Sequence, residues 1–402
     1  MTSPLPRVAI LAAVRTPIGK FGGALREVPA VELGTLAVQA VLSRGGVTPG
    51  DIPFVIMGHC IQAGAGQNSA RQVLRGAGIP DRSGAFTVNM VCGSGMQAVI
   101  AATSAIRAGE HALMVAGGME SMSSAPFLLS SKARWGIRYG SLPLDDAMLR
   151  DSLLDAYGDH EHMGLTGERV ARHFGITRPE VDAFALRSHH AAARANSDGT
   201  FAEETVPVPK EVARPGGLDH DEGPRGDTTL ERLGRLAPAF SETGVLTAGN
   251  SSQLSDGAAA LLLASESEAE RRGIVPIAWI HSSEVGGVAP SHVMESPIPT
   301  VRSHLERVGL EASEIDRVEH NEAFASASIA VQRAFHFPDE RFNVHGGAVA
   351  LGHPIGASGA RIVVTLLHEL ARTRGRLGLA TLCMGGGNGL SLIVEREPAH
   401  AR

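Results

Sequence analysis

Short apolar runs alternate with amphipathic segments through the first 125 residues. The runs VAILAAV (8–14), FVIMG (54–58), FTVNMV (86–91) and ALMVAGG (112–118) have the length and composition of buried β-strands. Segments between them, such as VELGTLAVQAVLSRG (31–45), repeat apolar residues at helical spacing. Strands that alternate with helices predict an α/β unit built on a buried sheet.

The pattern changes after about residue 121. Residues 126–245 carry many charges, glycines and prolines, including the polar stretch RPGGLDHDEGPRGDTT (214–229). Within this region, PEVDAFALRSHHAAARANSDG (179–199) predicts a helix that stops between Asn196 and Gly199. We expect the whole region to be an inserted loop domain.

A second strand–helix alternation begins near IAWIHSS (277–283) and continues to the end, and it follows the plan of the first. Each half is expected to hold a strand ending in a loop, a helix of small residues, and a strand ending in glycines. These segments are VNMVCGSG, QAVIAATSAIRAG and ALMVAGG in the first half, and FNVHGGAVALGHPIG, ASGARIVVTLLHEL and GLATLCMGGG in the second. The sequence therefore predicts two similar α/β halves packed face to face. The expected division is 1–121 plus 252–276, then 122–251, then 277–402.

Composition narrows the class of protein. A chain of 402 residues with 43% hydrophobic residues has enough apolar surface for a large core. Three cysteines, odd in number and far apart, argue against a disulfide framework and suit a reducing compartment, so a cytoplasmic location is expected. The net charge of −6 gives no general attraction to nucleic acid or to anionic membranes. No apolar run approaches the roughly 18 residues of a membrane span.

Cys92 follows an apolar run and precedes a helix of small residues. Unpaired N–H groups at a helix N-terminus favour a thiolate, and Gly93 and Gly95 allow a tight turn that leaves the thiol approachable. A lone cysteine is more often a small core residue, which is the role expected for Cys60. The flanking glycines and the partners described below favour a nucleophile at Cys92.

Gly93, Gly95 and Ala98 also complete a GxGxxA pattern, and Glu120 closes the next strand. This is the fingerprint of a dinucleotide-binding site. The thiol directly before the first glycine occupies space that a pyrophosphate needs, which disfavours a nicotinamide cofactor.

His353 lies among small residues in GGAVALGHPIGASGA (346–360), followed by Pro354 and flanked by Gly352 and Gly356. A lone histidine is usually structural or solvated. An imidazole fixed by glycine and proline is expected to be held for position, and a neutral imidazole can take a proton from a thiol.

Cys383 ends another apolar run and precedes three consecutive glycines that begin at Gly385. Such a run exposes backbone N–H groups that can hold an oxyanion, and a second thiolate can remove a proton from an incoming substrate. Asn321 also follows an apolar run, and an asparagine there can fix a water or a substrate carbonyl. The histidine cluster HEHMG (160–164) has no further soft ligand at suitable spacing, so no metal is expected.

Taken together, these segments resemble the thiolase family, most closely its acetyl-CoA acetyltransferases. The resemblance covers nearly the whole chain, from RTPIGKFGG (15–23) to CMGGGNG (383–389). It includes GGMESMSSAP, HMGLTGERVA, TAGNSSQLSDGAAA, NEAFA and GGAVALGHPIGASGAR. The two cysteines with GHPIGASGAR are highly specific, whereas NEAF alone is weaker.

The resemblance implies a mechanism for these residues. Cys92, deprotonated by His353, would attack acetyl-CoA and become acetylated, with the carbonyl oxygen against the backbone N–H groups of Cys92 and Gly385. A second acetyl-CoA would bind with its thioester oxygen between His353 and a water held by Asn321. Cys383 would then remove the α-proton, and the carbanion would attack the acetyl-cysteine to give acetoacetyl-CoA. In reverse, CoA would cleave a 3-ketoacyl-CoA.

The resemblance also implies a five-layered αβαβα fold of two similar halves, with the inserted loop domain covering the pantetheine arm. It implies a homo-oligomer, dimer or tetramer, and no tightly bound cofactor, with CoA and acyl-CoA acting as substrates. The residues it places around the substrate are His162, Met163, Phe240, Ala248, Ser252, Met294, Ala323 and Phe324.

Two departures from the family pattern bear on the substrate. Many short-chain members have VMGxGPxP where this chain has VMESPIP (293–299), which is one residue shorter and lacks both glycines. Met294 in that segment would face the acyl group, so acyl length and branching are open. Ala237 in RLAPAF stands where a second basic residue is common, so contacts to the CoA phosphates are expected to differ.

Three alternatives stay open beside a short-chain thiolase. One is a degradative thiolase for longer 3-ketoacyl-CoA. Another is a condensing enzyme like the ketoacyl synthases, in which histidine typically replaces the second cysteine; Cys383 and the long insertion disfavour it. The third is a non-catalytic acyl-CoA-binding protein, which would have no need of two positioned thiols.

Overall fold

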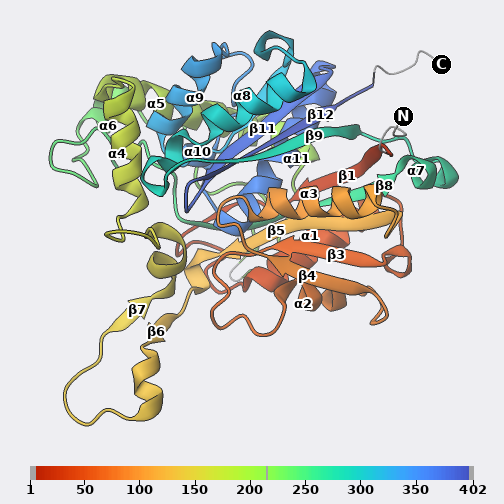
Figure 1. The fold of residues 1–402 in the computed structure, drawn as a ribbon, viewed down its shortest axis with the longest axis horizontal. Helices are drawn as coiled ribbons and strands as arrows, with labels where there is room; N and C mark the ends of the chain where they lie inside the picture. Colours follow the sequence, from red (N-terminus) through yellow and green to blue (C-terminus); the bar gives the residue numbers. More distant parts are fainter. Residues whose placement is uncertain (1–5, 214–215, 398–402) are drawn as a thin grey trace.

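The computed structural model describes residues 6–213 and 216–397. One ten-stranded sheet runs through both halves of the chain, in the order β10-β11-β12-β9-β1-β8-β5-β3-β4, with β2 paired to β8. The halves lie one above the other in Figure 1, and a thin arm projects from the body.

The strands of the first half are β1 (Val8–Arg15), β2 (Gly19–Lys20), β3 (Phe54–Gly58), β4 (Gly84–Val88), β5 (Leu113–Ser121) and β8 (Ser255–Ser265). Its helices are α1 (Ala30–Arg44), α2 (Ser69–Gly76), α3 (Ser94–Arg107) and α7 (Glu266–Arg272). β3 runs parallel to β5, whereas β8 runs antiparallel to both β5 and β1.

The strands of the second half are β9 (Ala278–Gly287), β10 (Arg317–His320), β11 (Leu377–Met384) and β12 (Asn388–Glu395). Its helices are α8 (Pro297–Val308), α9 (Ala325–Phe335), α10 (Ala348–Leu351) and α11 (Ile355–Thr373). β10 runs parallel to β11, and β12 runs antiparallel to β11 and β9. The set β10-β11-β12-β9 thus repeats the strand directions of β3-β5-β8-β1.

Helices α3 and α11 lie between the two halves of the sheet. α3 packs on β3 and β5, α11 packs on strands of both halves, and the two helices pack on each other. α1 and α2 cover the outer face of the first half, and α8 covers that of the second with α9 beside it. Within the described part of the chain, the strands of the two halves pair with each other where Val8–Ile10 of β1 runs beside β9. This order of layers confirms the expected αβαβα fold.

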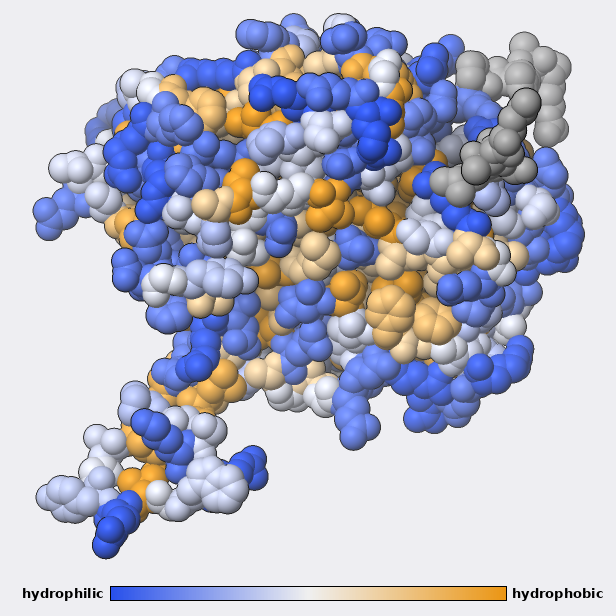
Figure 2. All heavy atoms as spheres, in the orientation of Figure 1, coloured by the Kyte–Doolittle hydropathy of each residue, from blue (hydrophilic) through white to orange (hydrophobic). Residues whose placement is uncertain are grey.

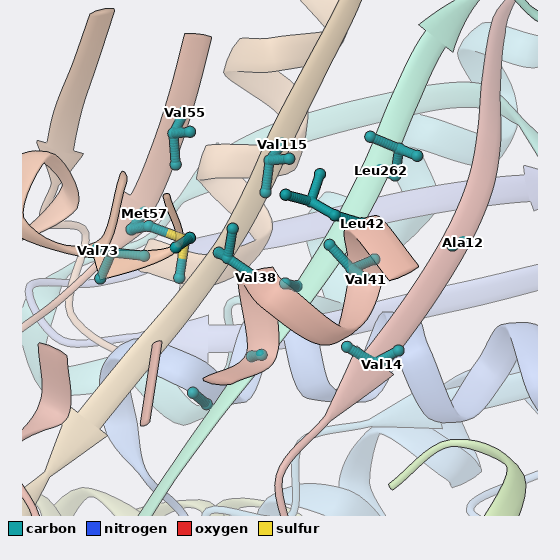
Figure 3. Packing of buried hydrophobic residues seen from close by; sticks show 14 of the residues in the cluster. Ala12, Val14, Val38, Val41, Leu42, Val55, Met57, Val73, Val115 and Leu262 are labelled. Atoms are coloured by element: carbon teal, nitrogen blue, oxygen red, sulfur yellow. The ribbon is translucent and has the colours of Figure 1, made fainter. Parts of the chain in front are cut away.

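The amphipathic segment expected at 31–45 forms α1, and its apolar face covers the sheet. Val38, Val41 and Leu42 of this helix lie against Val115 of β5 and Leu262 of β8 (Figure 3). Val41 and Leu42 follow Val38 by three and four residues, and this spacing places all three side chains on one face of the helix. Burying such side chains contributes about 1.5–3 kcal/mol each.

The central helices approach closely because they carry small residues. A Cβ at Gly95 of α3 would lie 2.8 Å from the backbone nitrogen of Ala360 in α11. A Cβ at Gly359 of α11 would lie 2.6 Å from the nitrogen of Met96. Gly95 therefore serves helix packing, which accounts for the second glycine of the GxGxxA pattern.

The inserted region contains β6 (Phe127–Leu129), β7 (Leu144–Asp146), α4 (Met163–His173), α5 (Arg178–Ser197) and α6 (Leu230–Gly234). β6 and β7 form a separate two-stranded sheet at the base of the projecting arm (Figure 1). The predicted helix at 179–199 is confirmed as α5, and Gly199 beyond it has φ of 82°. The division of the chain at 121/122, 251/252 and 276/277 stays a prediction.

The predicted strand at FNV (342–344) is wrong. Phe342 forms only an isolated bridge with Val318, and Asn343 has φ of 46°, a left-handed conformation that interrupts a strand. The Asn343 side chain accepts a hydrogen bond from the His320 backbone nitrogen at 2.7 Å and donates to its carbonyl at 2.9 Å. The side chain thus makes contacts to β10 that a strand backbone would otherwise supply.

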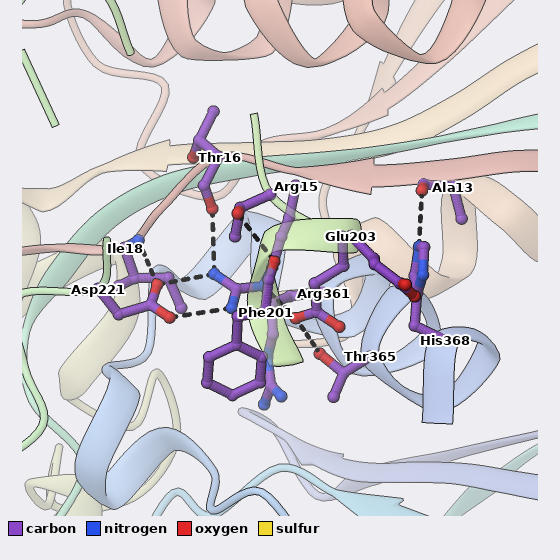
Figure 4. A network of polar contacts seen from close by, with 12 residues as sticks. Ala13, Arg15, Thr16, Ile18, Phe201, Glu203, Asp221, Arg361, Thr365 and His368 are labelled. Atoms are coloured by element: carbon purple, nitrogen blue, oxygen red, sulfur yellow. Dashed lines mark hydrogen bonds and ion pairs between the residues drawn. The ribbon is translucent and has the colours of Figure 1, made fainter. Parts of the chain in front are cut away.

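A buried ionic network ties the inserted region to the rest of the protein (Figure 4). The Arg15 guanidinium at the end of β1 contacts Glu204 at 2.5 Å and Asp221 at 2.7 Å. Thr365 of α11 donates to Glu204 at 3.0 Å. Removing one partner of such a buried group costs about 3–5 kcal/mol because the other charge is left uncompensated.

Candidate active site

Cys92 lies in the turn between β4 and α3, and its neighbour is strained. Val91 has φ of 49°, which for a β-branched residue is a genuine outlier that costs about 1–3 kcal/mol. Asn89 and Ser94 hold this conformation through hydrogen bonds of 2.9 Å to the Val91 nitrogen and 2.7 Å to its carbonyl. The sequence gives no sign of this strain, because valine normally avoids a positive φ.

His353 lies between α10 and α11, and its Nε2 is 3.3 Å from Cys92 Sγ. Its Nδ1 is 2.6 Å from Ser358 Oγ, and that hydroxyl is itself 2.9 Å from the Pro354 carbonyl, to which it donates. Ser358 Oγ therefore accepts from Nδ1–H, which assigns the proton to Nδ1 and leaves a lone pair on Nε2. The imidazole is oriented to accept the thiol proton. Ser358 was not foreseen, although it belongs to the GHPIGASGA segment.

Glu120 fixes the loop that carries His353. Its carboxylate accepts hydrogen bonds from the backbone nitrogens of Gly356 at 2.9 Å, Cys60 at 3.2 Å and Ile61 at 3.3 Å. His59 Nε2 lies 3.3 Å from the same carboxylate. Glu120 is the acidic residue that would bind a ribose hydroxyl in a dinucleotide-binding site. Here its carboxylate is occupied by protein contacts, so its role is structural.

Cys383 lies near the end of β11 and is buried. Its Sγ is 3.5 Å from Met294 Sδ. Both belong to one apolar cluster with Met163, Ala323 and Phe324. The structure therefore places four of the predicted substrate-binding residues in one cluster with the second thiol.

The backbone N–H groups of Gly385 and Cys92 lie near Cys92 Sγ, where both lower the pKa of the thiol. Gly386 and Gly387, which follow, have φ of 87° and 93°, a region that only glycine adopts without strain. The run of glycines therefore brings the predicted oxyanion donors to the first thiol.

Asn321 lies just after β10 and is fully buried. Its Nδ2 is 3.4 Å from His353 Nε2, and its Oδ1 has no hydrogen-bond partner among the described residues. Glu322 next to it accepts from Ser188 Oγ of α5 at 2.7 Å and from Asn343 Nδ2 at 2.9 Å. Glu322 thus joins the Asn321 loop to the inserted region, a role that the sequence did not reveal.

Burial sets the protonation of the site. Desolvation raises the pKa of Cys92 to about 12, although the backbone N–H groups of Gly385 and Cys92 oppose the shift. Desolvation lowers the pKa of His353 to about 3, with a smaller effect of the Arg361 charge, and it raises the pKa of Cys383 well above its usual value. The backbone N–H groups at Cys92 favour the thiolate, as expected, but desolvation has the larger effect and keeps the thiol protonated.

Of the remaining predicted substrate residues, His162 caps α4, and the others lie in the loop between α6 and β8. The His162 ring stacks on Phe240 at 5.2 Å, and Phe240 meets Phe324 edge-on at 5.7 Å. The Ser252 nitrogen donates to the Ala323 carbonyl at 3.0 Å, which places Ser252 beside Phe324. The structure thus brings these residues together next to the thiols. The predicted residue Ala248 is exposed in the turn at 247–250 and lies outside this packed row.

A thiol paired with a neutral imidazole, a second buried thiol and two convergent N–H groups define an enzyme that transfers acyl groups through a cysteine. Family models for the thiolase N-terminal domain and the thiolase C-terminal domain match residues 8–267 and 274–396. The chain belongs to the thiolase family, as its motifs predicted.

Relatives match the chain over nearly its full length. It is 47% identical to an acetyl-CoA acetyltransferase of Escherichia coli, over 96% of this chain and 98% of the relative. It is 43% identical to a probable acetyl-CoA acyltransferase of Staphylococcus epidermidis, over 98% of this chain and 99% of that one. The crystal structure of the Bacillus anthracis acetyl-CoA acetyltransferase, 42% identical, superimposes with a TM-score of 0.95 over 98% of this chain and 100% of that one. Across the described residues, no helix has the length and apolar character to cross a membrane.

Proposed function

We propose that this thiolase condenses two acetyl-CoA to acetoacetyl-CoA and CoA, or catalyses the reverse thiolysis, through an acetyl-Cys92 intermediate. The observation that carries the proposal is the 3.3 Å contact between Cys92 Sγ and His353 Nε2, with the Gly385 N–H directed at the same sulfur. The two relatives named acetyl-CoA acetyltransferase support the choice of acyl group.

In the first step, Cys92 Sγ attacks the thioester carbon while its proton passes to His353 Nε2. The oxygen of the tetrahedral intermediate becomes negative, and the N–H groups of Cys92 and Gly385 stabilise it. The C–S bond to CoA then breaks, and the departing CoA sulfur takes the proton from His353. Because thiol and imidazole are both neutral at rest, proton transfer accompanies the attack.

In the second step, the neutral Cys383 thiol gives its proton to His353, which is neutral again after CoA has left, and the resulting thiolate removes an α-proton from a second acetyl-CoA. Burial raises the pKa of Cys383, so its thiolate is a stronger base, which suits a weakly acidic carbon. The carbanion attacks the acetyl carbon, the bond to Cys92 Sγ breaks, and the released Cys92 sulfur takes the proton from His353, 3.3 Å away, while Cys383 keeps the α-proton. The enolate oxygen would lie near His353 Nε2 and a water held by Asn321, whose buried polar atoms face this region.

Met294 supports a short acyl chain. It lies in the 3-10 segment η6 (Pro290–Glu295), is 3% exposed, and its sulfur is 3.5 Å from Cys383 Sγ. Its position in the apolar cluster with Met163 and Phe324 fills space beside the second thiol. A longer 3-ketoacyl chain would have to displace this side chain, so the VMESPIP segment favours acetoacetyl-CoA over longer substrates.

The test is thiolysis of acetoacetyl-CoA beside a long-chain 3-ketoacyl-CoA, with Cys92→Ala as the blank. We expect faster cleavage of acetoacetyl-CoA. A preference for the long chain would replace the proposal with a degradative thiolase, and the absence of turnover with either would favour the acyl-CoA-binding alternative.

The pH dependence follows from His353. Its pKa of about 3 keeps the imidazole neutral and able to accept a proton throughout the range from pH 5 to pH 7.5. Function as a proton acceptor is lost only as pH falls toward that pKa. We therefore expect kcat/KM for acetoacetyl-CoA thiolysis to show no acid limb within this range. A limb with a midpoint near 6.5, the ordinary histidine value, would contradict the assignment.

We propose that the protein forms a homo-oligomer, a dimer or a tetramer. The projecting arm stands clear of the body in Figure 2, and it exposes large apolar side chains: Phe127, Leu129, Trp135, Ile137, Tyr139 and Leu144. Exposed apolar groups in such number are typical of an interaction surface. Light scattering on the purified protein measures the mass, and a monomer at micromolar concentration would contradict the proposal.

CoA and acyl-CoA are proposed to act as substrates rather than as resident cofactors, in the cytoplasm and in fatty-acid metabolism. Two of the three free cysteines have roles in the proposed mechanism, and the third is buried, which suits a reducing compartment. The net charge of −6 supports no nucleic-acid partner.

A further inference from the structure

Two histidines and a glutamate converge at the surface, outside the proposed mechanism. His173 ends α4, whereas His292 and Glu295 belong to η6. Glu295 Oε1 lies 3.0 Å from His173 Nδ1 and 3.1 Å from His292 Nδ1. The ligand atoms of all three residues lie within 4.8 Å of one another.

These distances suit a small tetrahedral metal ion. Zinc–ligand bonds of about 2.0–2.2 Å place neighbouring ligand atoms about 3.3 Å apart in a tetrahedron. The two nitrogen–oxygen distances are within a few tenths of an ångström of that value. Two imidazoles and one carboxylate form a zinc ligand set that leaves one position for water.

Burial and charge at the cluster also suit a bound cation. Glu295 has a side chain only 14% exposed, so its carboxylate is fixed, whereas the His173 and His292 side chains are 58% and 46% exposed and can be approached from solvent. The nearby Arg169 guanidinium is paired with Glu161 at 2.9 Å, which offsets its repulsion of a cation.

We propose that His173, His292 and Glu295 bind one zinc ion that cross-links α4 to η6. The two elements are already joined at this place, because Arg169 donates to the Ser291 carbonyl at 2.5 Å. Metal binding adds coordinate bonds to this hydrogen bond and to the His173–Glu295 contact, and makes the junction rigid. The site is separate from the thiols and takes no part in acyl transfer.

The junction restrains a wall of the active site. Val293 and Met294 lie between two of the proposed ligands, and both are buried. Met294 is the residue whose sulfur lies against Cys383. Zinc at the surface therefore fixes the backbone that positions Met294, and slower hydrogen exchange across residues 290–299 is the expected sign.

The experiment titrates the full-length protein with zinc against a competing chelator, after iodoacetamide has alkylated the active-site thiol. His173→Gln and His292→Gln each remove one ligand. His220→Gln is the matched control, because His220 is 63% exposed and pairs with a single carboxylate, Asp219, at 2.7 Å. We expect one zinc per chain, affinity reduced about tenfold or more in each ligand variant, and no change in the control.

Hydrogen exchange supplies a second readout that does not depend on activity. Zinc should slow exchange in residues 290–299 of the unsubstituted protein and of His220→Gln, but not of His292→Gln. Unchanged zinc affinity in both ligand variants would overturn the proposal. So would cobalt substitution that yields an intense thiolate charge-transfer band in unalkylated protein and no binding after alkylation, since the metal would then be at the thiols.

Discussion

Replacing Cys92 with serine is expected to abolish acyl transfer, lowering kcat by about 10⁴- to 10⁶-fold, as the loss of a catalytic nucleophile does. A serine hydroxyl is far less acidic and less nucleophilic than a thiol, so proton transfer to His353 during the attack is much less favourable. Intact-protein mass spectrometry after incubation with acetyl-CoA measures the intermediate directly.

Cys60→Ser is the matched control for this substitution. Cys60 is a buried cysteine whose sulfur lies 3.6 Å from the Asp151 carbonyl, and a serine hydroxyl can keep that contact. This variant should acetylate normally. Rapid acetylation of Cys92→Ser at another residue would show that Cys92 is not the nucleophile.

Replacing Cys383 with serine is expected to separate the two half-reactions. Acetylation of Cys92 should persist, slowed by no more than about tenfold, because the Cys92–His353 pair and the Gly385 N–H remain. Condensation should fall by about 10²- to 10⁴-fold, the usual contribution of a positioned base. Rapid-quench measurement of acetyl-enzyme, beside spectroscopic measurement of acetoacetyl-CoA, separates the two rates.

A different result would contradict the role proposed for Cys383. If acetylation and condensation fell by the same factor, Cys383 would have no separate role at the α-carbon. Unfolding is excluded as the cause by comparing the thermal midpoint of Cys383→Ser with that of Cys60→Ser, since both place a hydroxyl in a buried position.

Local sequence patterns identified the residues that carry the proposed chemistry, and two of them, Cys92 and His353, are in contact in the structure. Cys92, His353 and Cys383 each lie in a short glycine-containing segment at the end of a strand or the start of a helix, and such segments meet at one edge of an α/β sheet. The family resemblance then supplied the neighbours, of which His162, Phe240 and Phe324 do pack together. The buried run of β5 was likewise predicted from its composition.

The residues that support the site could not be predicted in this way. Glu120 and Glu322 act through hydrogen bonds to segments that approach only in the folded chain. Ser358 is close to His353 in the sequence, but the sequence does not show that its hydroxyl contacts Nδ1. The left-handed backbone at Val91 contradicts the preference of its residue type and exists only because its surroundings impose it. Sequence also misjudged the Cys92 thiol, since a partial charge at a helix end is visible in a pattern whereas the extent of desolvation is not.

The place of β1 in the sheet has a consequence for biosynthesis. This first strand is hydrogen-bonded on one side to β8 and on the other to β9, so its partners are encoded about two-thirds of the way along the chain. Such pairings have high contact order, and the entropy of closing the loop must be met before they contribute. Until the ribosome reaches residue 255, β1 lacks both neighbouring strands, and the earlier-made backbone partners of its last residue, Arg15, are Glu204 and Val206. Its protection from aggregation during translation therefore depends on chaperones or on transient non-native contacts, and not on the native sheet.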